Sequence, residues 1–124
     1  MREIENNFHN KNLGELGENK AINFLTKNGY NILERNFRSK NGEIDIIAKE
    51  KNEYVFIEVK TRASMRYGMP VEAVDKNKRE HILKASKYYI YKNYLQNKYI
   101  RFDIIEVYIN KNNYLINHIK NAFF

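Results

Sequence analysis

The sequence contains no cysteine and only one proline among its 124 residues. The lack of cysteine excludes a disulfide framework, a thiol nucleophile and a zinc site built on thiolates. Three scattered histidines, His9, His81 and His118, do not have the spacing of a metal site, and we assign them no role. No apolar run approaches the roughly 18 residues of a membrane span, and the polar start lacks the apolar core of a secretory signal. We therefore expect a soluble, cytoplasmic protein that does not bind a membrane.

Basic residues outnumber acidic ones, with 22 Lys and Arg against 15 Asp and Glu, which gives a net charge of +7. Residues 60–92 contain nine basic and three acidic side chains, so this quarter of the chain supplies +6 of that charge. Such a balance favours a polyanionic partner. A solvated, lysine-rich surface with no partner is the alternative interpretation.

The chain has the length of one domain, since domains typically run to about 100–150 residues, and we expect residues 1–124 to form a single domain. Hydrophobic residues make up 43% of it, enough for a folded core. Periodicity, caps and β-branched runs predict two helices and five strands, in the order helix 13–28, strands 31–37, 43–49 and 54–61, helix 76–95, and strands 100–109 and 114–119. This order predicts an α/β fold, αβββαβ(β), with a mixed sheet flanked by helices and a right-handed parallel crossover through the second helix.

Local signals set the ends and buried faces of these elements. Asn12 is the expected N-cap of the first helix and Gly29 its C′ residue, while Asp75 is the expected N-cap of the second. Gly14 and Gly17 each cost about 1 kcal/mol relative to alanine inside a helix, so we expect a packing or substrate-access reason for them. The buried stripe of the second helix is predicted to be Ile82, Ala85 and Tyr89. Residues 100–109 are almost all apolar, as in a strand covered on both faces.

Two acidic residues fall opposite one another if the second and third strands form a hairpin that turns at residues 51–52. Asp45 then faces Glu58, and Glu43 faces Lys60. Cross-strand neighbours have Cβ atoms about 4.5–5.5 Å apart, so a pair of carboxylates there needs a cation. Lys60 points to the same face as Glu58 and is one candidate. A divalent metal ion is the other.

Asp45, Glu58 and Lys60 together have the groups that a phosphodiester hydrolase needs. Mg²⁺ or Mn²⁺ prefers oxygen ligands, takes one or two carboxylates and leaves other positions to water and phosphate. Lys60 could orient the attacking water or offset charge on the phosphate. Glu18 lies on or beside the sheet-facing side of the first helix and completes the predicted site. An exposed strand face with a Glu58–Lys60 salt bridge is the alternative.

Several motifs in sequence order resemble the YraN (UPF0102-type) family of small bacterial proteins: GELGENKA (14–21), GEIDIIA (42–48), VFIEVKTR (55–62), YGMP (67–70) and RFDIIEV (101–107). The resemblance covers about residues 12–110. That family is placed in the PD-(D/E)xK, restriction-endonuclease-like superfamily and is distantly similar to archaeal Holliday junction resolvases. The resemblance implies an αβββαβ core and a metal-dependent nuclease site. In that site Asp45 is the motif aspartate, Glu58 and Lys60 form the E-x-K, and Glu18 is the acid of the first helix.

Basic residues that follow this site are candidates for contact with phosphate. Arg62 continues the face of Glu58 and Lys60, and the others lie in the following loop or near the start of the second helix, namely Arg66, Lys76, Lys78 and Arg79. Tyr88, Tyr91 and Leu95 share a helix stripe that fits base stacking, a homodimer surface or the edge of the core.

These observations predict an endonuclease, dependent on Mg²⁺ or Mn²⁺, that hydrolyses phosphodiester bonds of branched or irregular DNA. The alternative is a nucleic-acid-binding module of the same fold that cleaves nothing. A basic adaptor with a protein target is a third, weaker hypothesis.

Overall fold

The computed structural model describes the backbone of residues 2–63 and 76–124, and within these ranges the side chains from residue 12 onward. Two helices and five strands follow in the predicted order: α1 (Arg2–Lys27), β1 (Asn31–Ser39), β2 (Gly42–Glu50), β3 (Glu53–Arg62), α2 (Lys76–Lys92), β4 (Tyr99–Asn110) and β5 (Asn113–Ile119). The sheet order is β1-β2-β3-β4-β5. Only the β3–β4 pair is parallel, so the predicted mixed sheet and parallel crossover are confirmed.

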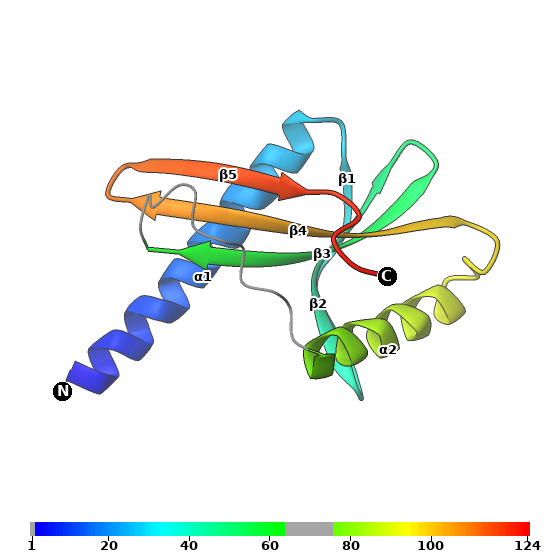
Figure 1. Ribbon diagram of the computed structural model, residues 1–124, viewed down its shortest axis with the longest axis horizontal. Coiled ribbons are helices and arrows are strands. Elements are labelled where there is room, and N and C mark those ends of the chain that lie inside the picture. Colours follow the sequence, from blue (N-terminus) through cyan, green and yellow to red (C-terminus); the bar gives the residue numbers. More distant parts are fainter. Residues whose placement is uncertain (1, 64–75) are drawn as a thin grey trace.

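The helices pack on opposite faces of this sheet (Figure 1). On one face, Ala21 and Leu25 of α1 lie against the apolar residues of β2, β3 and β4. On the other face, α2 contributes the predicted stripe of Ile82, Ala85 and Tyr89. Strand β4 is buried on both sides along nearly its whole length, as its continuous apolar sequence predicts.

The C-terminal end of α1 follows the sequence, but its beginning does not. Gly29 adopts a φ of 88°, its N–H donates to the carbonyl of Thr26, and the N–H of Tyr30 donates to the carbonyl of Leu25, which is the bonding pattern of a Schellman cap. The predicted N-cap at Asn12 is wrong, because α1 already begins at Arg2. Residues 2–11 contain neither glycine nor proline, so nothing in them interrupts the helix before Asn12.

The second helix is shorter than predicted and ends at Lys92. The N–H of Leu95 donates to the carbonyl of Ile90, and Leu95 turns into the core with an exposed fraction of 6%. The predicted stripe of Tyr88, Tyr91 and Leu95 therefore does not exist as one surface. The expected N-cap, Asp75, lies outside the described residues.

The hairpin register matches the prediction. Strands β2 and β3 pair from Glu50–Glu53 to Ile46–Ile57, so the next step along both strands sets Asp45 opposite Glu58. The ladder between them ends at Ile46–Ile57, whereas β2 stays paired with β1 down to Gly42. The β1–β2 hairpin thus leaves β3 at Asp45 and runs toward the start of α2 (Figure 1).

Candidate active site

Asp45 lies at the point where β2 separates from β3. Its Oδ2 accepts a hydrogen bond of 2.8 Å from the backbone N–H of Val59, a donor that the ended ladder leaves available. Burial raises the pKa of Asp45 from its ordinary 3.8 to about 7, and the negative charge of Glu58 adds to the rise. The hydrogen bond from Val59 and the charge of Lys78 oppose it. Asp45 and Glu58 therefore lie close enough for the charge of Glu58 to act on Asp45, as the register predicts.

Glu18 of α1 approaches the same place from the other side of the sheet. Burial raises its pKa, and the nearby charge of Asp45 raises it further, while Arg35 and a hydrogen bond with Asn36 lower it. The structure thus gathers Glu18, Asp45 and Glu58, which we call the acidic cluster, from α1, β2 and β3. In the sequence, α1 is separated from β2 and β3 by β1. These elements meet here because α1 packs on the sheet beside the β2–β3 hairpin.

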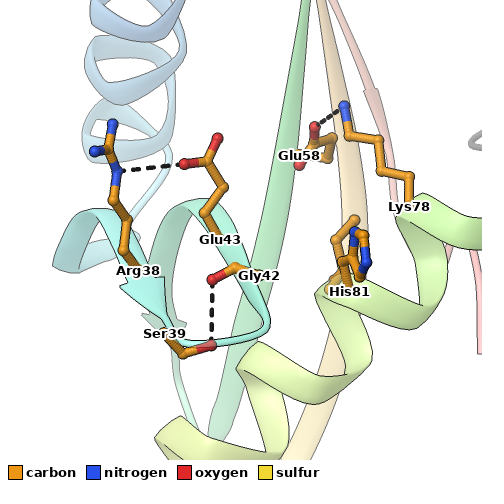
Figure 2. Close-up of a pocket in the computed structure, with 8 residues that line it drawn as sticks. Arg38, Ser39, Gly42, Glu43, Glu58, Lys78 and His81 are labelled. Carbon is orange, nitrogen blue, oxygen red and sulfur yellow. Dashed lines mark hydrogen bonds and ion pairs between the residues drawn. The ribbon is translucent and has the colours of Figure 1, made fainter.

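Glu58 forms an ion pair with Lys78, a residue that the strand pattern did not indicate as its partner. Its Oε1 lies 2.5 Å from Nζ of Lys78, which reaches across from the first turn of α2 (Figure 2). The side chain of Glu58 is 7% exposed and that of Lys78 is 48% exposed, so the pair stands at the border of the solvent. Lys60 has no ion pair within the part of the chain that the structure describes. Of the two cations considered for Glu58, Lys60 is therefore not its ion-pair partner in the described residues, and α2 supplies a lysine that the strand pattern cannot reveal. The divalent metal ion stays a prediction.

A cavity of about 360 Å³ opens beside this ion pair. Its lining comes from the end of the β1–β2 hairpin, from β3 and from α2 and consists of Arg38, Ser39, Gly42, Glu43, Glu58, Lys78, His81 and Ile82. Gly42 sits against the backbone carbonyl of His81, so a side chain at this position would collide with α2. Glu43 forms a 3.3 Å ion pair with Arg38 (Figure 2) rather than lying against Lys60. The hairpin end and the first two turns of α2 thus enclose a polar space next to Glu58.

The remaining predicted site residues occupy separate positions. Lys60 and Arg62 are partly buried on β3, in register with Glu106 and Tyr108 of β4. Lys76 and Arg79 are exposed at the start of α2. Lys76 lines a shallow surface groove together with Asn77, Lys78 and His81. Arg66 lies outside the described residues.

The donor groups of the acidic cluster fit a hard divalent cation. Carboxylate oxygens are the ligands that Mg²⁺ and Mn²⁺ prefer, and such ions are commonly held by one or two carboxylates with water and substrate in the other positions. In residues 12–63 and 76–124, no group of three or more Asp, Glu or His side chains stands ready to hold a metal ion. The carboxylates of Asp45 and Glu58 are of the type that would hold such an ion, and Glu18 would remain a nearby charge.

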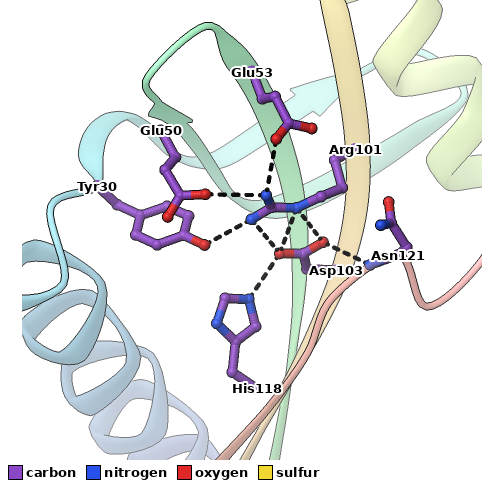
Figure 3. A network of polar contacts seen from close by, with 7 residues as sticks. All are labelled: Tyr30, Glu50, Glu53, Arg101, Asp103, His118 and Asn121. Carbon is purple, nitrogen blue, oxygen red and sulfur yellow. Dashed lines mark hydrogen bonds and ion pairs between the residues drawn. The ribbon is translucent and has the colours of Figure 1, made fainter.

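A second polar cluster, which no pattern in the sequence indicates as a whole, lies at the turn between β2 and β3 (Figure 3). Arg101 donates to Asp103 at 2.9 Å and to the hydroxyl of Tyr30 at 2.6 Å, and it also forms ion pairs with Glu50 and Glu53. His118, to which we assigned no role, lies 2.7 Å from Oδ2 of Asp103, and Asn121 donates its backbone N–H to Oδ1. Arg101 and Asp103 are two residues apart on β4, so alternation alone places them on one face of the strand. The other members come from distant segments and left no local signal.

The fold and the site together define an α/β protein whose mixed sheet carries an acidic cluster where one hairpin leaves the central strands. The chain belongs to the family UPF0102, because a family model described as "Uncharacterised protein family UPF0102" matches residues 17–107. This agrees with the motifs quoted above. Neither helix in the described part of the chain combines the length and hydropathy needed to cross a membrane.

Bacterial relatives resemble the chain along nearly its whole length, and each is named a UPF0102 protein. The relative from Caldicellulosiruptor saccharolyticus is 52% identical and covers 91% of this chain and 98% of its own. That from Clostridioides difficile strain 630 is 50% identical over 93% and 99%, and that from Clostridium botulinum strain Hall is 54% identical over 92% and 95%. The crystal structure of SSO0001 is similar over 90% of this chain and 52% of its own, with 19% identity and a TM-score of 0.37, a likeness too loose to carry an argument.

Proposed function

We propose that this protein is an endonuclease, dependent on Mg²⁺ or Mn²⁺, that hydrolyses phosphodiester bonds of branched or irregular DNA. The observation that carries the proposal is the meeting of Asp45 and Glu58 at the end of the β2–β3 ladder, beside a polar cavity. A largely buried Asp45 whose charged form is destabilised by burial and by the neighbouring Glu58 is an arrangement that a bound cation stabilises. The net charge of +7 favours a polyanionic substrate.

In this proposal the carboxylates of Asp45 and Glu58 hold the metal ion. When bound, such an ion polarises the phosphate and lowers the pKa of a bound water. The hydrogen bond from Val59 keeps Asp45 turned toward β3. Lys78 is paired with Glu58, and its ammonium group can shift from Glu58 to a phosphate oxygen of the substrate. Arg38, in the lining of the same cavity, supplies a second cation. Lys60, Arg62, Lys76 and Arg79 are proposed to contact the phosphate backbone on either side.

The test measures cleavage of duplex, single-stranded, flap and four-way-junction DNA with Mg²⁺, with Mn²⁺ and with EDTA. We expect cleavage only with a metal ion, and we expect Asp45→Asn and Glu58→Gln each to reduce it by about 100-fold or more, since loss of a group that stabilises transition-state charge costs roughly 10²–10³ in rate. Lys60→Ala is expected to reduce it less. Glu18→Gln removes the third carboxylate of the acidic cluster and is also expected to reduce cleavage. Glu15→Gln, on the exposed side of α1, is its matched control and should cleave as wild type does. Equal cleavage by wild type and Asp45→Asn would exclude this site.

A non-catalytic nucleic-acid-binding module is the second candidate. It is favoured by the Lys78–Glu58 ion pair, which already supplies Glu58 with a cation. This candidate predicts DNA binding that weakens steeply with salt and does not change with Mg²⁺. Measuring affinity over a salt series with EDTA, and again with Mg²⁺, separates it from the nuclease.

A further inference from the structure

A second groove of about 410 Å³ continues from the cavity at Glu58 along the outside of α2. It is lined by the end of the β1–β2 hairpin and by one side of α2, namely by Arg38, Ser39, Lys40, Asn41, Lys84 and Tyr88. Arg38 and Ser39 line both spaces. The second groove therefore adjoins the cavity beside Glu58 and has Tyr88 in its own lining.

Tyr88 is held in place although it is 48% exposed. Its ring stacks on Phe37 with centroids 6.1 Å apart and an angle of 24° between the planes. Phe37 is in turn supported by Tyr89, whose ring meets it edge-on at 5.2 Å. Tyr88 is thus a fixed aromatic platform at the end of the groove. It loses little conformational entropy when a flat ligand covers it.

The charges along the groove suit an anionic ligand. Among the described residues, its lining contains three cations, Arg38, Lys40 and Lys84, and no carboxylate. Arg38 is shared with Glu43, at 3.3 Å. Lys40 and Lys84 are exposed and have no ion pair with any other described residue. A row of cations that ends on an aromatic ring matches a phosphodiester backbone with a base at its end.

The stacking platform distinguishes single-stranded from duplex DNA. Inside a duplex both faces of a base are covered by its neighbours, so only an unpaired, splayed base can lie on an aromatic side chain. The groove volume also lies near the small end of the range of about 300–1,000 Å³ that ligand sites span, which suits one nucleotide and not a base pair.

We propose that the second groove binds an unpaired nucleotide of single-stranded DNA, with its base on Tyr88 and the adjoining phosphates at Lys40 and Lys84. The inference deepens the proposed function and rests on it, because the groove adjoins the cavity at Glu58 and a strand bound there would extend toward the acidic cluster. The preferred substrate is then DNA with a single-stranded arm next to the scissile bond. Binding in the groove itself requires neither metal nor cleavage.

The test is the binding of a labelled oligo(dT) of about ten nucleotides, a length typical of single-strand sites, in EDTA. Fluorescence anisotropy is recorded for wild type, Tyr88→Ala and Tyr88→Phe. Tyr91→Ala is the matched control, since Tyr91 is a 73% exposed tyrosine of the same helix that does not line the groove. We expect Tyr88→Ala to lower the affinity about 5- to 100-fold, the range seen when a stacking aromatic is removed. Tyr88→Phe and Tyr91→Ala should bind as wild type does, and duplex affinity should not change.

A second variant tests the phosphate contacts. Lys84→Gln is expected to reduce the slope of log affinity against log salt by about 0.7, the value for one phosphate contact on a single strand. Unchanged oligo(dT) affinity of Tyr88→Ala, or an equal loss in Tyr91→Ala, would overturn the proposal. The proposal would also be overturned if Tyr88→Ala changed the mass measured by sedimentation and left the oligo(dT) affinity unchanged. Tyr88 would then be covered by a second copy of the chain. Absence of cleavage with Mg²⁺ or Mn²⁺ affects only the proposed nuclease.

Discussion

At the scale of single residues, the carboxylate of Asp45 is the most perturbed acidic group of the site. Its charged form is destabilised by burial and by the neighbouring charge of Glu58, and the hydrogen bond from Val59 offsets only part of this. Structural carboxylates usually show the opposite shift, because ion pairs lower their pKa. A carboxylate whose charge destabilises the fold at neutral pH is typical of functional sites, and this agrees with the proposed role of Asp45.

The raised pKa of Asp45 predicts that the metal-free protein becomes less stable as the pH rises. The folded state keeps the proton up to about pH 7, whereas the unfolded chain releases it near 3.8. The free energy of unfolding should thus fall between these values, by about 2–4 kcal/mol, and level off above them. Glu18, whose pKa is also raised, contributes with the same sign.

Urea denaturation in EDTA at about pH 4.5 and about pH 8 measures this effect. Asp45→Asn can still accept the hydrogen bond from Val59, so it should lose most of the pH dependence and be more stable than wild type at the higher pH. Addition of Mg²⁺ at the higher pH should stabilise wild type but not Asp45→Asn. A wild-type stability that rises over this pH range would contradict the assigned environment of Asp45.

At the scale of elements, two glycines of α1 differ in what they do. A Cβ at Gly17 would meet the side chain of Thr61 on β3 well inside van der Waals contact, so Gly17 lets the helix approach the strand that carries Glu58. A Cβ at Gly14 would meet nothing within 4 Å. The predicted packing reason is confirmed for Gly17, whereas no described residue packs against Gly14, for which the alternative reason of substrate access stays a prediction. The approach of α1 to β3 also brings Glu18, the next residue, beside Asp45.

Alanine substitutions at the two glycines should have opposite effects on stability. Both gain about the same helix propensity, on the order of 1 kcal/mol, so Gly14→Ala is expected to stabilise the protein by up to that amount. Gly17→Ala should instead destabilise it by about 1–3 kcal/mol, because overpacking displaces Thr61 or the helix. Adding Thr61→Ala to Gly17→Ala should restore part of the loss, since it removes Oγ1 and Cγ2 but keeps Cβ. Thermal and urea unfolding of these three variants and the wild type check these values, and equal stability of the two single variants would refute the close contact.

At the scale of the whole molecule, the cluster around Arg101 ties the two ends of the described fold together. Tyr30 follows α1, Glu50 and Glu53 flank the β2–β3 turn, and His118 and Asn121 come from the C-terminal strand and tail. Burial opposes the charge of Asp103, but hydrogen bonds from His118 and Arg101 hold its pKa below the ordinary value. This carboxylate therefore stabilises the fold above its ordinary pKa, and the stabilisation is lost as the pH falls further.

Removal of one partner from this cluster should destabilise the whole molecule. Arg101→Met leaves Asp103 buried and less compensated, which typically costs about 3–5 kcal/mol. Adding Asp103→Asn should recover part of that loss, because the uncompensated charge disappears. Glu53→Gln, on a side chain that is 43% exposed, should cost less than about 1 kcal/mol. Urea denaturation measures all three, and a loss in Arg101→Met no larger than that in Glu53→Gln would contradict the role of the cluster.

The sequence by itself determined the order of the elements, the hairpin register and the buried stripe of α2. These follow from contacts between near neighbours: alternation along strands, periodicity along helices, and the turn at residues 51–52 that sets Asp45 opposite Glu58. The C-cap at Gly29 is equally local, since one residue with a positive φ ends the helix. The start of α1 was predicted wrongly. Asn12 can act as an N-cap only if the residues before it are not helical, and residues 2–11 continue the helix.

Only the tertiary structure decided which distant residues complete the site. Lys78 reaches Glu58 because α2 packs against the β1–β2 hairpin and its first turn lies beside β3. Glu18 reaches Asp45 because Gly17 lets α1 approach Thr61. Nor does any local pattern join Arg101 to Tyr30, His118 and Asn121. Periodicity fixes the face on which a residue lies, whereas the element that covers that face follows from how the whole chain excludes water.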